Sequence, residues 1–222
     1  MRSFDEIFDI AAERKGGASA LNDLMVQPKT IAELKTIGDD RWLSCMTKCI
    51  FQAGFNWKVI ENMWPGFEEA FDGFDIGRCV MLNDDDFDRL VANKSIVRHG
   101  TKIRAVQQNA AFISELAKHH GSAATALAEW PSEDYVGLLA MLKKRGARLG
   151  GNTGPYFLRF MNVDGFILSR DVTARLIAEG VIDKTPTSQK AWGSVQDAFN
   201  TWKQQSGRSL TEISRVLAFS IG

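Results

Sequence analysis

Cations and glycines are concentrated in one short stretch of this chain, and their spacing is typical of a site that binds phosphate. Residues 143–154 contain four cations and four glycines, namely Lys143, Lys144, Arg145, Arg148, Gly146, Gly150, Gly151 and Gly154. Glycines let a backbone turn tightly, and turn amides that lead into a helix bind anions. Lysine and arginine add charge that attracts a phosphate backbone. The stretch therefore predicts an anion-binding hairpin between two helices; the alternative is a helical joint with solvated charges.

The elements around this hairpin are all expected to be helices. Apolar residues recur at helical spacing, whereas the alternation typical of strands is almost absent. The expected helices cover residues 3–14, 29–37, 39–53, 56–64, 67–72, 75–80, 84–92, 100–118, 132–144, 153–163, 171–179, 188–205 and 209–219. Thr30 and Glu33 have capping-box spacing. Asp39 or Asp40, and then Asn56, can cap the next two helices. The sequence predicts an all-α protein, an irregular helical array with a helix-hairpin-helix at 142–163.

Composition places the chain among ordinary globular proteins. It has 222 residues, of which 45% are apolar, so it is long enough for one large domain or two small ones. Lys plus Arg and Asp plus Glu both number 27, so any sign of nucleic-acid binding must be local. No apolar run reaches the ~18 residues of a membrane span. Acids in the N-terminal segment MRSFDEIFDI argue against a signal peptide. We therefore expect a cytoplasmic protein.

Cysteine and histidine are too scarce for a disulfide framework or a zinc site. They comprise only Cys45, Cys49, Cys79, His99, His119 and His120. An odd number of cysteines does not suit a disulfide framework. A tetrahedral zinc site needs four ligands, or three and a water, from residues that converge. We expect no metal and no other cofactor.

Three segments are in register with the motifs of one family. The first, QAGFNW at 52–57, is similar to Q-A-G-L-S-W. The second, IVRHGTKI at 96–103 with Asn109 six residues on, is similar to I-x-R-(N/H)-x-x-K-I…N. The third, LKKRGARLGG at 142–151, is similar to L-K-K-R-G-F-x-F-V-G. Together, over residues 39–172, they resemble the DNA-3-methyladenine glycosylase I family, within the helix-hairpin-helix DNA glycosylase superfamily.

The resemblance implies a role for the first motif in handling a base. A DNA glycosylase extrudes a base from the duplex, fills the gap and holds the base in a pocket. By resemblance, Gly54 and Phe55 form the turn that probes or fills the stack. Trp57 is the aromatic wall of the base pocket, which also includes Gln52. The alternative for Phe55 and Trp57 is plain core packing.

The DNA-binding residues implied by the resemblance lie on the turn, on the second motif and on the hairpin. They are Gly54, Arg98, Lys102, Lys143, Lys144, Arg145, Gly146, Arg148, Gly150 and Gly151. The alternative for Arg98 and Lys102, which are one helical turn apart, is a solvated face. For His99 the alternative to acid-base chemistry is a helix cap or a buried hydrogen bond. We expect DNA binding to be weak, non-specific and sensitive to salt.

The chain departs from the family at several places. The family has a Glu that contacts the flipped base where this chain has Cys49, and a thiol is a weak acceptor. The family's zinc site and its N-terminal aromatic cluster also have no counterpart. The resemblance therefore implies a zinc-free, divergent relative whose base selectivity is altered or lost. We expect Trp57 to line a cavity bordered by Cys49, with Phe55 at its mouth.

A second candidate for catalysis is Asp171. Many relatives in the wider superfamily place an Asp just before the helix that follows the hairpin helix. An ungapped match puts Ser169 at that position, and Asp171 comes two residues later. The alternative is that Asp171 caps the helix at 172–179.

Three functions from different classes remain open. The first is a monofunctional DNA glycosylase of base-excision repair, which hydrolyses the N-glycosidic bond of alkylated purines such as 3-methyladenine. Water is its nucleophile, and it has no lyase step. The second is a catalytically silent DNA-binding or damage-sensing protein on the same fold, and the third is a helical protein-interaction module.

The expected partner is double-stranded DNA carrying alkylated bases, bound by a monomer at the cytoplasmic nucleoid, without membrane contact. We expect one glycosylase-like unit over residues 1–222. Within it, residues 1–38 form a divergent N-terminal helical segment, 39–172 carry the family resemblance and 173–222 form C-terminal helices.

Overall fold

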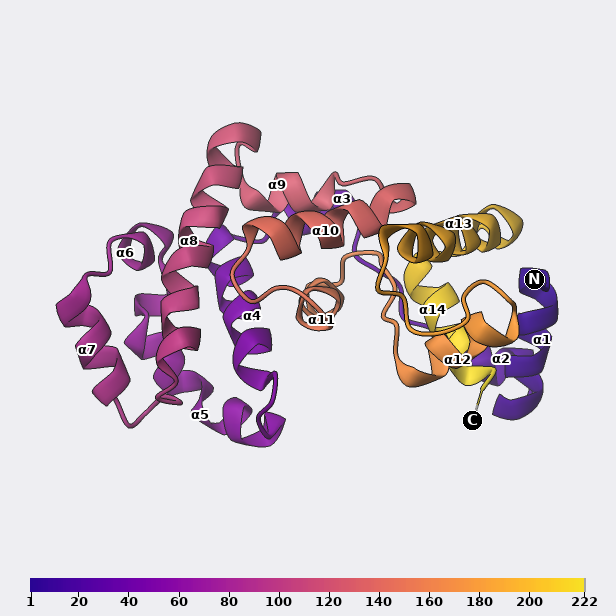
Figure 1. The fold of residues 1–222 in the computed structure, drawn as a ribbon, viewed down its shortest axis with the longest axis horizontal. Coiled ribbons are helices and arrows are strands. Elements are labelled where there is room, and N and C mark those ends of the chain that lie inside the picture. The colour runs from indigo at the N-terminus through magenta and orange to yellow at the C-terminus, as the bar shows by residue number, and fades with distance from the viewer. Residues whose placement is uncertain (222) are drawn as a thin grey trace. The chain divides into compact units, whose positions relative to one another are not determined.

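The computed structural model describes residues 1–221, whose regular secondary structure is helical (Figure 1). These residues form fourteen α-helices and two short 3₁₀-helices, with no strand among them. The prediction of an all-α helical array is therefore confirmed. None of the described helices is long and apolar enough to cross a membrane.

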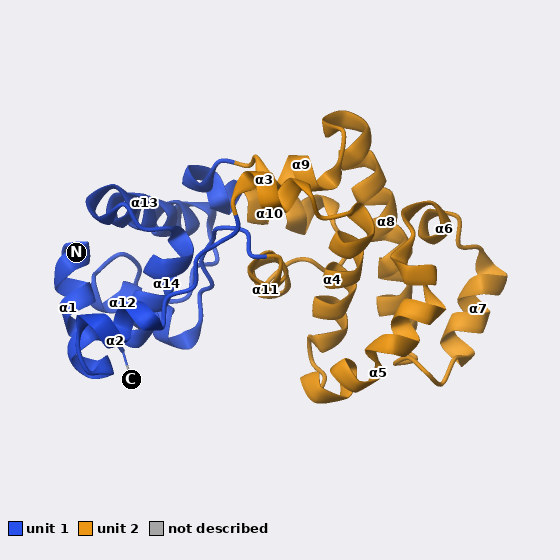
Figure 2. Cartoon of the chain, turned by 180° about the vertical axis from the view of Figure 1, so that it is seen from behind, with its two compact units in different colours: residues 1–29, 131–137, 162–222 blue, residues 30–130, 138–161 orange. Residues whose placement is uncertain are grey.

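Contacts between residues group the chain into two compact units (Figure 2). Unit 1 consists of residues 1–29, 131–137 and 162–222, and unit 2 of residues 30–130 and 138–161. Helix α10 (Tyr135–Arg145) therefore begins in unit 1 and ends in unit 2. The division into segments 1–38, 39–172 and 173–222 stays a prediction.

Unit 1 is built largely from the two ends of the sequence. Its elements are α1 (Phe4–Lys15), α2 (Ala18–Asp23), η2 (Ser132–Asp134), α12 (Arg170–Ala178), α13 (Gln189–Ser206) and α14 (Leu210–Phe219). Its core contains buried aromatic rings: Phe166 stacks on Phe199, with ring centres 4.1 Å apart. Phe199 packs edge-on against Trp202. Helix α2 was not predicted, because only one of its six residues, Leu21, is buried and no apolar stripe marks it.

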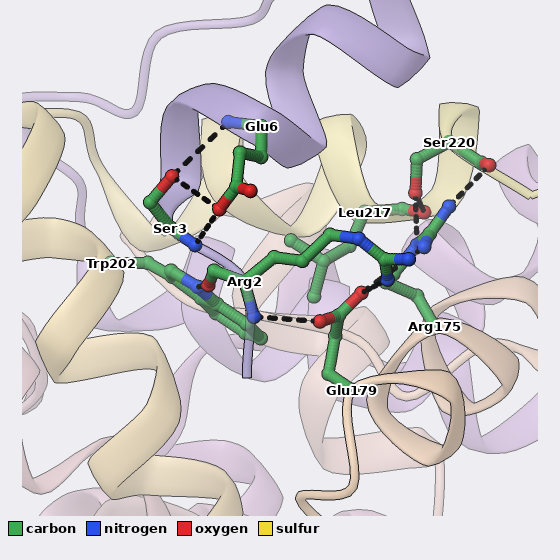
Figure 3. Close-up of polar contacts among 8 residues, drawn as sticks. All are labelled: Arg2, Ser3, Glu6, Arg175, Glu179, Trp202, Leu217 and Ser220. Carbon is green, nitrogen blue, oxygen red and sulfur yellow. Dashed lines mark hydrogen bonds and ion pairs between the residues drawn. The ribbon is translucent and has the colours of Figure 1, made fainter.

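A buried ion-pair network joins the start of the chain to α12 (Figure 3). The carboxylate of Glu179 accepts hydrogen bonds from the backbone N and the Nη1 of Arg2, both at 2.8 Å. It also accepts one from Nη1 of Arg175 at 3.1 Å. Arg175 in turn donates to the Oγ and the carbonyl oxygen of Ser220. Buried charges are tolerated when each one is paired and hydrogen-bonded, as these are.

Unit 2 holds the predicted motifs. Its elements are α3 (Ile31–Lys35), α4 (Asp39–Gln52), α5 (Trp57–Ala70), η1 (Asp72–Phe74), α6 (Ile76–Val80), α7 (Asp84–Ala92), α8 (Gly100–His120), α9 (Ala123–Ala128), most of α10, and α11 (Thr153–Phe160). The long helix α8 packs on α4, α6, α7 and α9 (Figure 1). Helix α4 also contacts α5 and α11. These packed helices position the residues of all three motifs.

Helix α5 differs from the prediction of two separate helices at 56–64 and 67–72. It runs without a break through Pro65. The prediction was wrong here because packing outweighs the helix-breaking tendency of proline. Trp64 stacks on Phe67 at 5.0 Å, and Phe67 is completely buried. The helix expected at 153–163 also ends earlier, at Phe160.

The start of α4 differs as well. Its N-cap is Gly38, not Asp39 or Asp40. The Oδ1 atom of Asp39 instead accepts hydrogen bonds from the amides of Ala123 at 3.0 Å and Ala124 at 3.3 Å. Asp39 therefore satisfies the first amides of α9, a helix that the sequence did not predict.

Candidate nucleic-acid interface

The hairpin of unit 2 consists of residues 146–152, between α10 and α11. Leu142 and Leu149 are at most 1% exposed and anchor it from the inside. Glycine is needed at positions 146 and 154, where the backbone comes close to Leu149. A Cβ on Gly146 would lie 2.5 Å from Cδ1 of Leu149, and a Cβ on Gly154 would lie 2.7 Å from the Leu149 carbonyl oxygen. The predicted helix-hairpin-helix is thus present, and close packing explains Gly146 and Gly154.

Asn109 of α8 holds the hairpin backbone in place. Its Oδ1 accepts from the Ala147 amide at 2.8 Å, and its Nδ2 donates to the Ala147 carbonyl at 3.1 Å. Asn109 is completely buried. Within the described residues, the amides of 149–151 donate no backbone hydrogen bond. Amides without acceptors in a fixed turn are suited to binding an oxygen anion.

Arg145 is the most restrained cation of the hairpin. Its Nη2 atom lies 2.9 Å from Oε1 of Glu115 on α8. Its guanidinium group also packs over the ring of Phe112. This exposed ion pair adds little to stability, but it competes with phosphate for the guanidinium group. We therefore expect Arg145 to contribute less to DNA binding than its position in the sequence suggests.

The other predicted cations are more available. Lys143, Lys144 and Arg148 are exposed, and so is Arg98 of the second motif. The Nη1 atom of Arg148 lies 3.4 Å from Oγ1 of Thr101, at the start of α8. The hairpin and the start of α8 therefore share one basic surface region of unit 2.

The first motif forms a tight turn between α4 and α5. Gly54 has a φ of +78°, which lies in the left-handed region that favours glycine. The Phe55 amide donates to the Gln52 carbonyl at 3.1 Å. Oδ1 of Asn56 accepts from the Lys58 amide at 2.9 Å, so the predicted cap is confirmed. Phe55 is 39% exposed, which excludes the core-packing alternative for this side chain.

Lys102 supports this turn from inside the unit. Its Nζ donates to the carbonyl oxygens of Phe51 at 3.2 Å and Ala53 at 2.6 Å, and lies 4.4 Å from the centre of the Phe55 ring. The residue is only 3% exposed. Burial, together with the nearby charge of Arg148, lowers the pKa of its ammonium group. This corrects both the predicted direct DNA contact and the solvated-face alternative, because the ammonium group is already bound to the end of a helix.

His99 connects the turn to the hairpin region. It occupies the N-cap position of α8, as the cap alternative expects, although its side chain makes no capping bond. Its ring packs edge-on against Phe55, with the centres 6.3 Å apart. Its Nδ1 lies 3.2 Å from Oγ1 of Thr101, which also contacts Arg148. A continuous series of contacts therefore runs from the hairpin to Phe55.

Trp57 belongs to an exposed aromatic cluster. Its ring packs edge-on against Tyr156 at 5.6 Å and Phe160 at 5.9 Å, both on α11. Trp57 is 45% exposed and Phe160 47%, so the core-packing alternative for Trp57 is wrong. We did not predict Tyr156 and Phe160 as site residues. Their spacing of four residues, on the helix that follows the hairpin, is the signal that would have found them.

Cys49 is buried in α4 and does not border an open site. It is 4% exposed. The neighbouring Cys45 thiol and burial raise the pKa of the Cys49 thiol far above its usual range, so it stays neutral and cannot act as a base. The cavity expected between Cys49 and Trp57 stays a prediction. A small cavity of about 10 Å³ lies elsewhere and is lined by Leu82, Phe87, Leu90, Ile103, Arg104 and Gln107.

A polar cluster lies close to Trp57 on α4 and α5. Nε2 of Gln52 donates to Oε1 of Glu61 at 3.1 Å. Nζ of Lys48 lies 2.7 Å from Oε2 of the same carboxylate. Gln52 is 4% exposed, and its Oε1 has no hydrogen-bond partner in the described part of the chain. An unpartnered buried acceptor costs about 1–3 kcal/mol. Sequence reasoning missed Glu61, because no motif includes it.

Comparison with known proteins agrees with this arrangement. The family model described as methyladenine glycosylase matches residues 35–136, which include the turn and the whole of α8. DNA-3-methyladenine glycosylase 1 of Escherichia coli (strain K12) is 28% identical over 134 aligned residues, in an alignment that covers 52% of this chain and 71% of that protein. The chain is similar to methyladenine glycosylases over this part of its length. The hairpin lies beyond the residues that the family model matches, so its assignment depends on its geometry.

Solved structures share the fold of this chain. 3-Methyladenine DNA glycosylase I of Staphylococcus aureus has a TM-score of 0.51 at 21% identity, over 57% of this chain and 77% of that one. The 8-oxoguanine glycosylase/lyase of Methanocaldococcus jannaschii has a TM-score of 0.52 at 15% identity, over 96% of each chain. The second likeness extends over nearly all of the sequence, including the helices outside the family match.

Asp171 lies in unit 1 and does not cap α12 in the way expected. The N-cap is Ser169, whose Oγ accepts from the Val172 amide at 3.2 Å. Asp171 stands in the first turn of the helix, with Oδ1 3.5 Å from Nε of Arg170. The capping alternative is therefore wrong, and a catalytic role for Asp171 stays a prediction.

Metal ligands do not converge in the described residues. No group of three or more His, Cys, Asp or Glu side chains among residues 1–221 is placed to hold a metal ion. Cys45, Cys49 and Cys79 are free thiols. That the protein works without zinc stays a prediction, which metal analysis of the purified protein will test.

Proposed function

We propose that the protein is a DNA glycosylase of base-excision repair that hydrolyses the N-glycosidic bond of alkylated purines such as 3-methyladenine. The observation that carries this proposal is the exposed cluster of Trp57, Tyr156 and Phe160, in which Trp57 follows the Phe55 turn directly. The names of the relatives support it. One is DNA-3-methyladenine glycosylase 1, and the structure of the Staphylococcus aureus protein concerns recognition of 3-methyladenine.

Double-stranded DNA is the proposed partner, held mainly by its phosphates. The amides of 149–151 and the exposed side chains of Lys144 and Arg148 offer contacts that do not depend on base sequence. Such contacts make binding weak, non-specific and sensitive to salt. The Methanocaldococcus jannaschii protein, whose structure includes a 15mer DNA, supports this choice. The protein binds as a monomer, at the nucleoid of the cytoplasm.

The turn and the aromatic cluster have different roles in base extrusion. Phe55 is half-exposed and held between Lys102 and His99, so it can enter the stack without first becoming ordered. The extruded base stacks on Trp57, and each stacked base contributes about 1–3 kcal/mol. This gain offsets the few kcal/mol that unstacking requires. Damaged bases are extruded most easily, which adds selectivity.

The bond-breaking step needs little help from acid or base groups of the protein. Water attacks the anomeric carbon of the sugar, and the bond to the base nitrogen breaks. The bonding electrons go to the base, which carries a positive charge when alkylated and therefore leaves neutral. The proton of the attacking water passes to solvent. Lys102 is committed to two backbone carbonyls, which supports a monofunctional enzyme without Schiff-base chemistry.

A second candidate function is a DNA-binding or damage-sensing protein without catalysis. The observation that favours it is the buried, neutral thiol of Cys49, which cannot replace a carboxylate. Such a protein would bind alkylated DNA through the same hairpin and release no base.

One experiment separates these two functions. The protein is incubated with methylated duplex DNA, and free bases are identified by mass, with unmethylated duplex as the control. Release of 3-methyladenine supports the enzyme. Tight binding of methylated DNA without base release supports the damage sensor, and the absence of both contradicts the two proposals together.

A further inference from the structure

Glu61 is placed beside the aromatic cluster by helix geometry. It follows Trp57 by four residues on α5, so the two side chains lie on one face of the helix. Its Oε1 accepts a hydrogen bond from Gln52, and its side chain is 51% exposed. A carboxylate therefore lies near the exposed rings, where a ligand can reach it.

Gln52 adds a second acceptor at the same place. Its Nε2 is used by Glu61, whereas its Oε1 is buried and has no partner among residues 1–221. A ligand that brings an N–H group to this oxygen supplies the bond that the free protein lacks. A carboxylate and a carboxamide oxygen are both acceptors, so the cluster suits a ligand with an amino group.

We propose that Glu61 and Gln52 together bind the exocyclic amino group of a cationic alkylated purine whose ring stacks on Trp57, with Glu61 determining this specificity. The proposal rests on the proposed function and names the residue that selects its substrate. In an alkylated adenine the positive charge is shared between the ring and the amino group. The carboxylate attracts that charge, and an aromatic ring face attracts it as well. A neutral base gains neither interaction.

Glu68, seven residues further along α5, cannot take this role. Its carboxylate already accepts hydrogen bonds from Arg41, Ser44 and the indole of Trp64. Besides the hydrogen bond from Gln52 to Oε1, Glu61 has one ion pair, in which Nζ of Lys48 lies 2.7 Å from Oε2. A half-exposed pair of this kind is weak. A cationic ligand can therefore compete with Lys48 at little cost.

The test compares Glu61→Gln with Glu69→Gln. The first change keeps the shape of the side chain and removes its charge. The second removes one charge from an exposed position on the same helix. Base release is measured under single-turnover conditions from dimethyl-sulfate-treated DNA, which carries cationic bases, and from a duplex with neutral hypoxanthine.

Losing a hydrogen bond to a charged group predicts that E61Q lowers release of cationic bases about 10- to 100-fold. E69Q keeps wild-type rates, and both variants keep wild-type DNA binding and unfolding temperature.

Binding of small probes separates this proposal from the enzyme assignment. The probes are a permanently cationic 3,9-dialkyladeninium and a neutral 9-alkyladenine, measured by calorimetry. Wild-type protein is expected to prefer the cation by about tenfold or more, and E61Q to lose that preference. If wild-type protein releases no base but shows this Glu61-dependent preference, the enzyme assignment fails and the role of Glu61 stands. If E61Q matches E69Q, or loses cationic and neutral ligands equally, Glu61 does not determine specificity. If wild-type protein binds neither probe and releases no base, both proposals fail.

Discussion

The two units of the chain use charged residues in opposite ways. In unit 1, Arg175 and Glu179 are each 6% exposed and are bonded to each other and to neighbours in the same unit (Figure 3). In unit 2, Lys144 and Arg148 of the hairpin are exposed. Buried, paired charges are fixed in one geometry, whereas exposed cations can exchange water and counterions for phosphate. The contrast separates residues that hold the fold from residues that can bind a ligand.

Aromatic residues show the same contrast. Phe166, Phe199 and Trp202 are fully buried in unit 1 and stabilise its core. Trp57 and Phe160 of unit 2 are nearly half exposed, although they pack against each other. A large aromatic ring contributes more to packing when it is buried than when it is half exposed to water. Their exposure is therefore informative about function.

The largest expected effect lies in the buried network of unit 1. Glu179→Ala leaves Arg175 buried without its carboxylate, and breaking a buried pair in this way costs about 3–5 kcal/mol. The control is Glu133→Ala, which removes an exposed partner of Lys203 and should cost about 0–1 kcal/mol. Urea unfolding followed by tryptophan fluorescence measures both. Equal losses would contradict the distinction between buried and exposed pairs.

The same network predicts a pH dependence. Burial acts to raise the pKa of Glu179, but hydrogen bonds from Arg2 and Arg175 prevail, so the folded-state pKa is lowered. A lowered carboxyl pKa gives stability that is complete above the unfolded value and is lost as pH falls through the folded value. The free energy of unfolding of wild-type protein minus that of Glu179→Gln should therefore shrink below pH ~4.3. A constant difference at acidic pH would show that the charge of Glu179 is not what stabilises the unit.

The next largest effect concerns the support of the turn in unit 2. Lys102→Met removes the ammonium group from the carbonyls of Phe51 and Ala53. We expect a loss of about 1.5–3 kcal/mol, as for hydrogen bonds to charged groups, and a larger fall in base release than in DNA binding. Lys94→Met, at an exposed position, is the control. Unchanged stability of Lys102→Met would mean that the turn does not depend on this lysine.

Trp57→Ala tests whether the exposed cluster binds the base. Loss of stacking removes about 1–3 kcal/mol, which corresponds to a roughly 10- to 100-fold slower release of base. Non-specific DNA binding should persist, because the hairpin is untouched. Val59→Ala, 46% exposed on the same helix, is the matched control. A normal rate for Trp57→Ala would assign the base to another surface.

Local features of the fold could be predicted from the sequence, and features made by distant partners could not. The Asn56 cap and the hairpin glycines act within a few residues, so their patterns are readable. Helix α9 has a local cap, Ser122, but its first amides are satisfied by Asp39, 84 residues before Ala123. The continuity of α5 depends on packing that outweighs Pro65. The contacts of Asp39 and the packing around Pro65 leave no local signal.

The candidate site divides in the same way. The motif placed Phe55 and Trp57 correctly at a turn and a helix start, and both prove to be exposed. Lys102 has the spacing of a surface residue, but its partners, Phe51 and Ala53, lie 51 and 49 residues earlier on another helix. Glu61 likewise becomes part of the site only because α4 and α5 pack together, which brings it next to Gln52. Residue types suggested the site, and tertiary packing determined which of them are exposed.

The smallest expected effect is that of single hairpin cations. Each phosphate contact contributes about −0.9 to the slope of log K against log salt concentration. Replacing Lys144 and Arg148 together by Ala should therefore flatten the slope by about one to two units. Arg145→Ala should change it less, because Glu115 already holds that guanidinium group. Lys190→Ala, at an exposed position of unit 1, should leave the slope unchanged.

Fluorescence anisotropy of a labelled duplex over a salt series measures the wild-type protein and these three variants. If the double variant keeps the wild-type slope, the hairpin does not contact phosphate, and the contrast between the two units no longer identifies the DNA-binding surface.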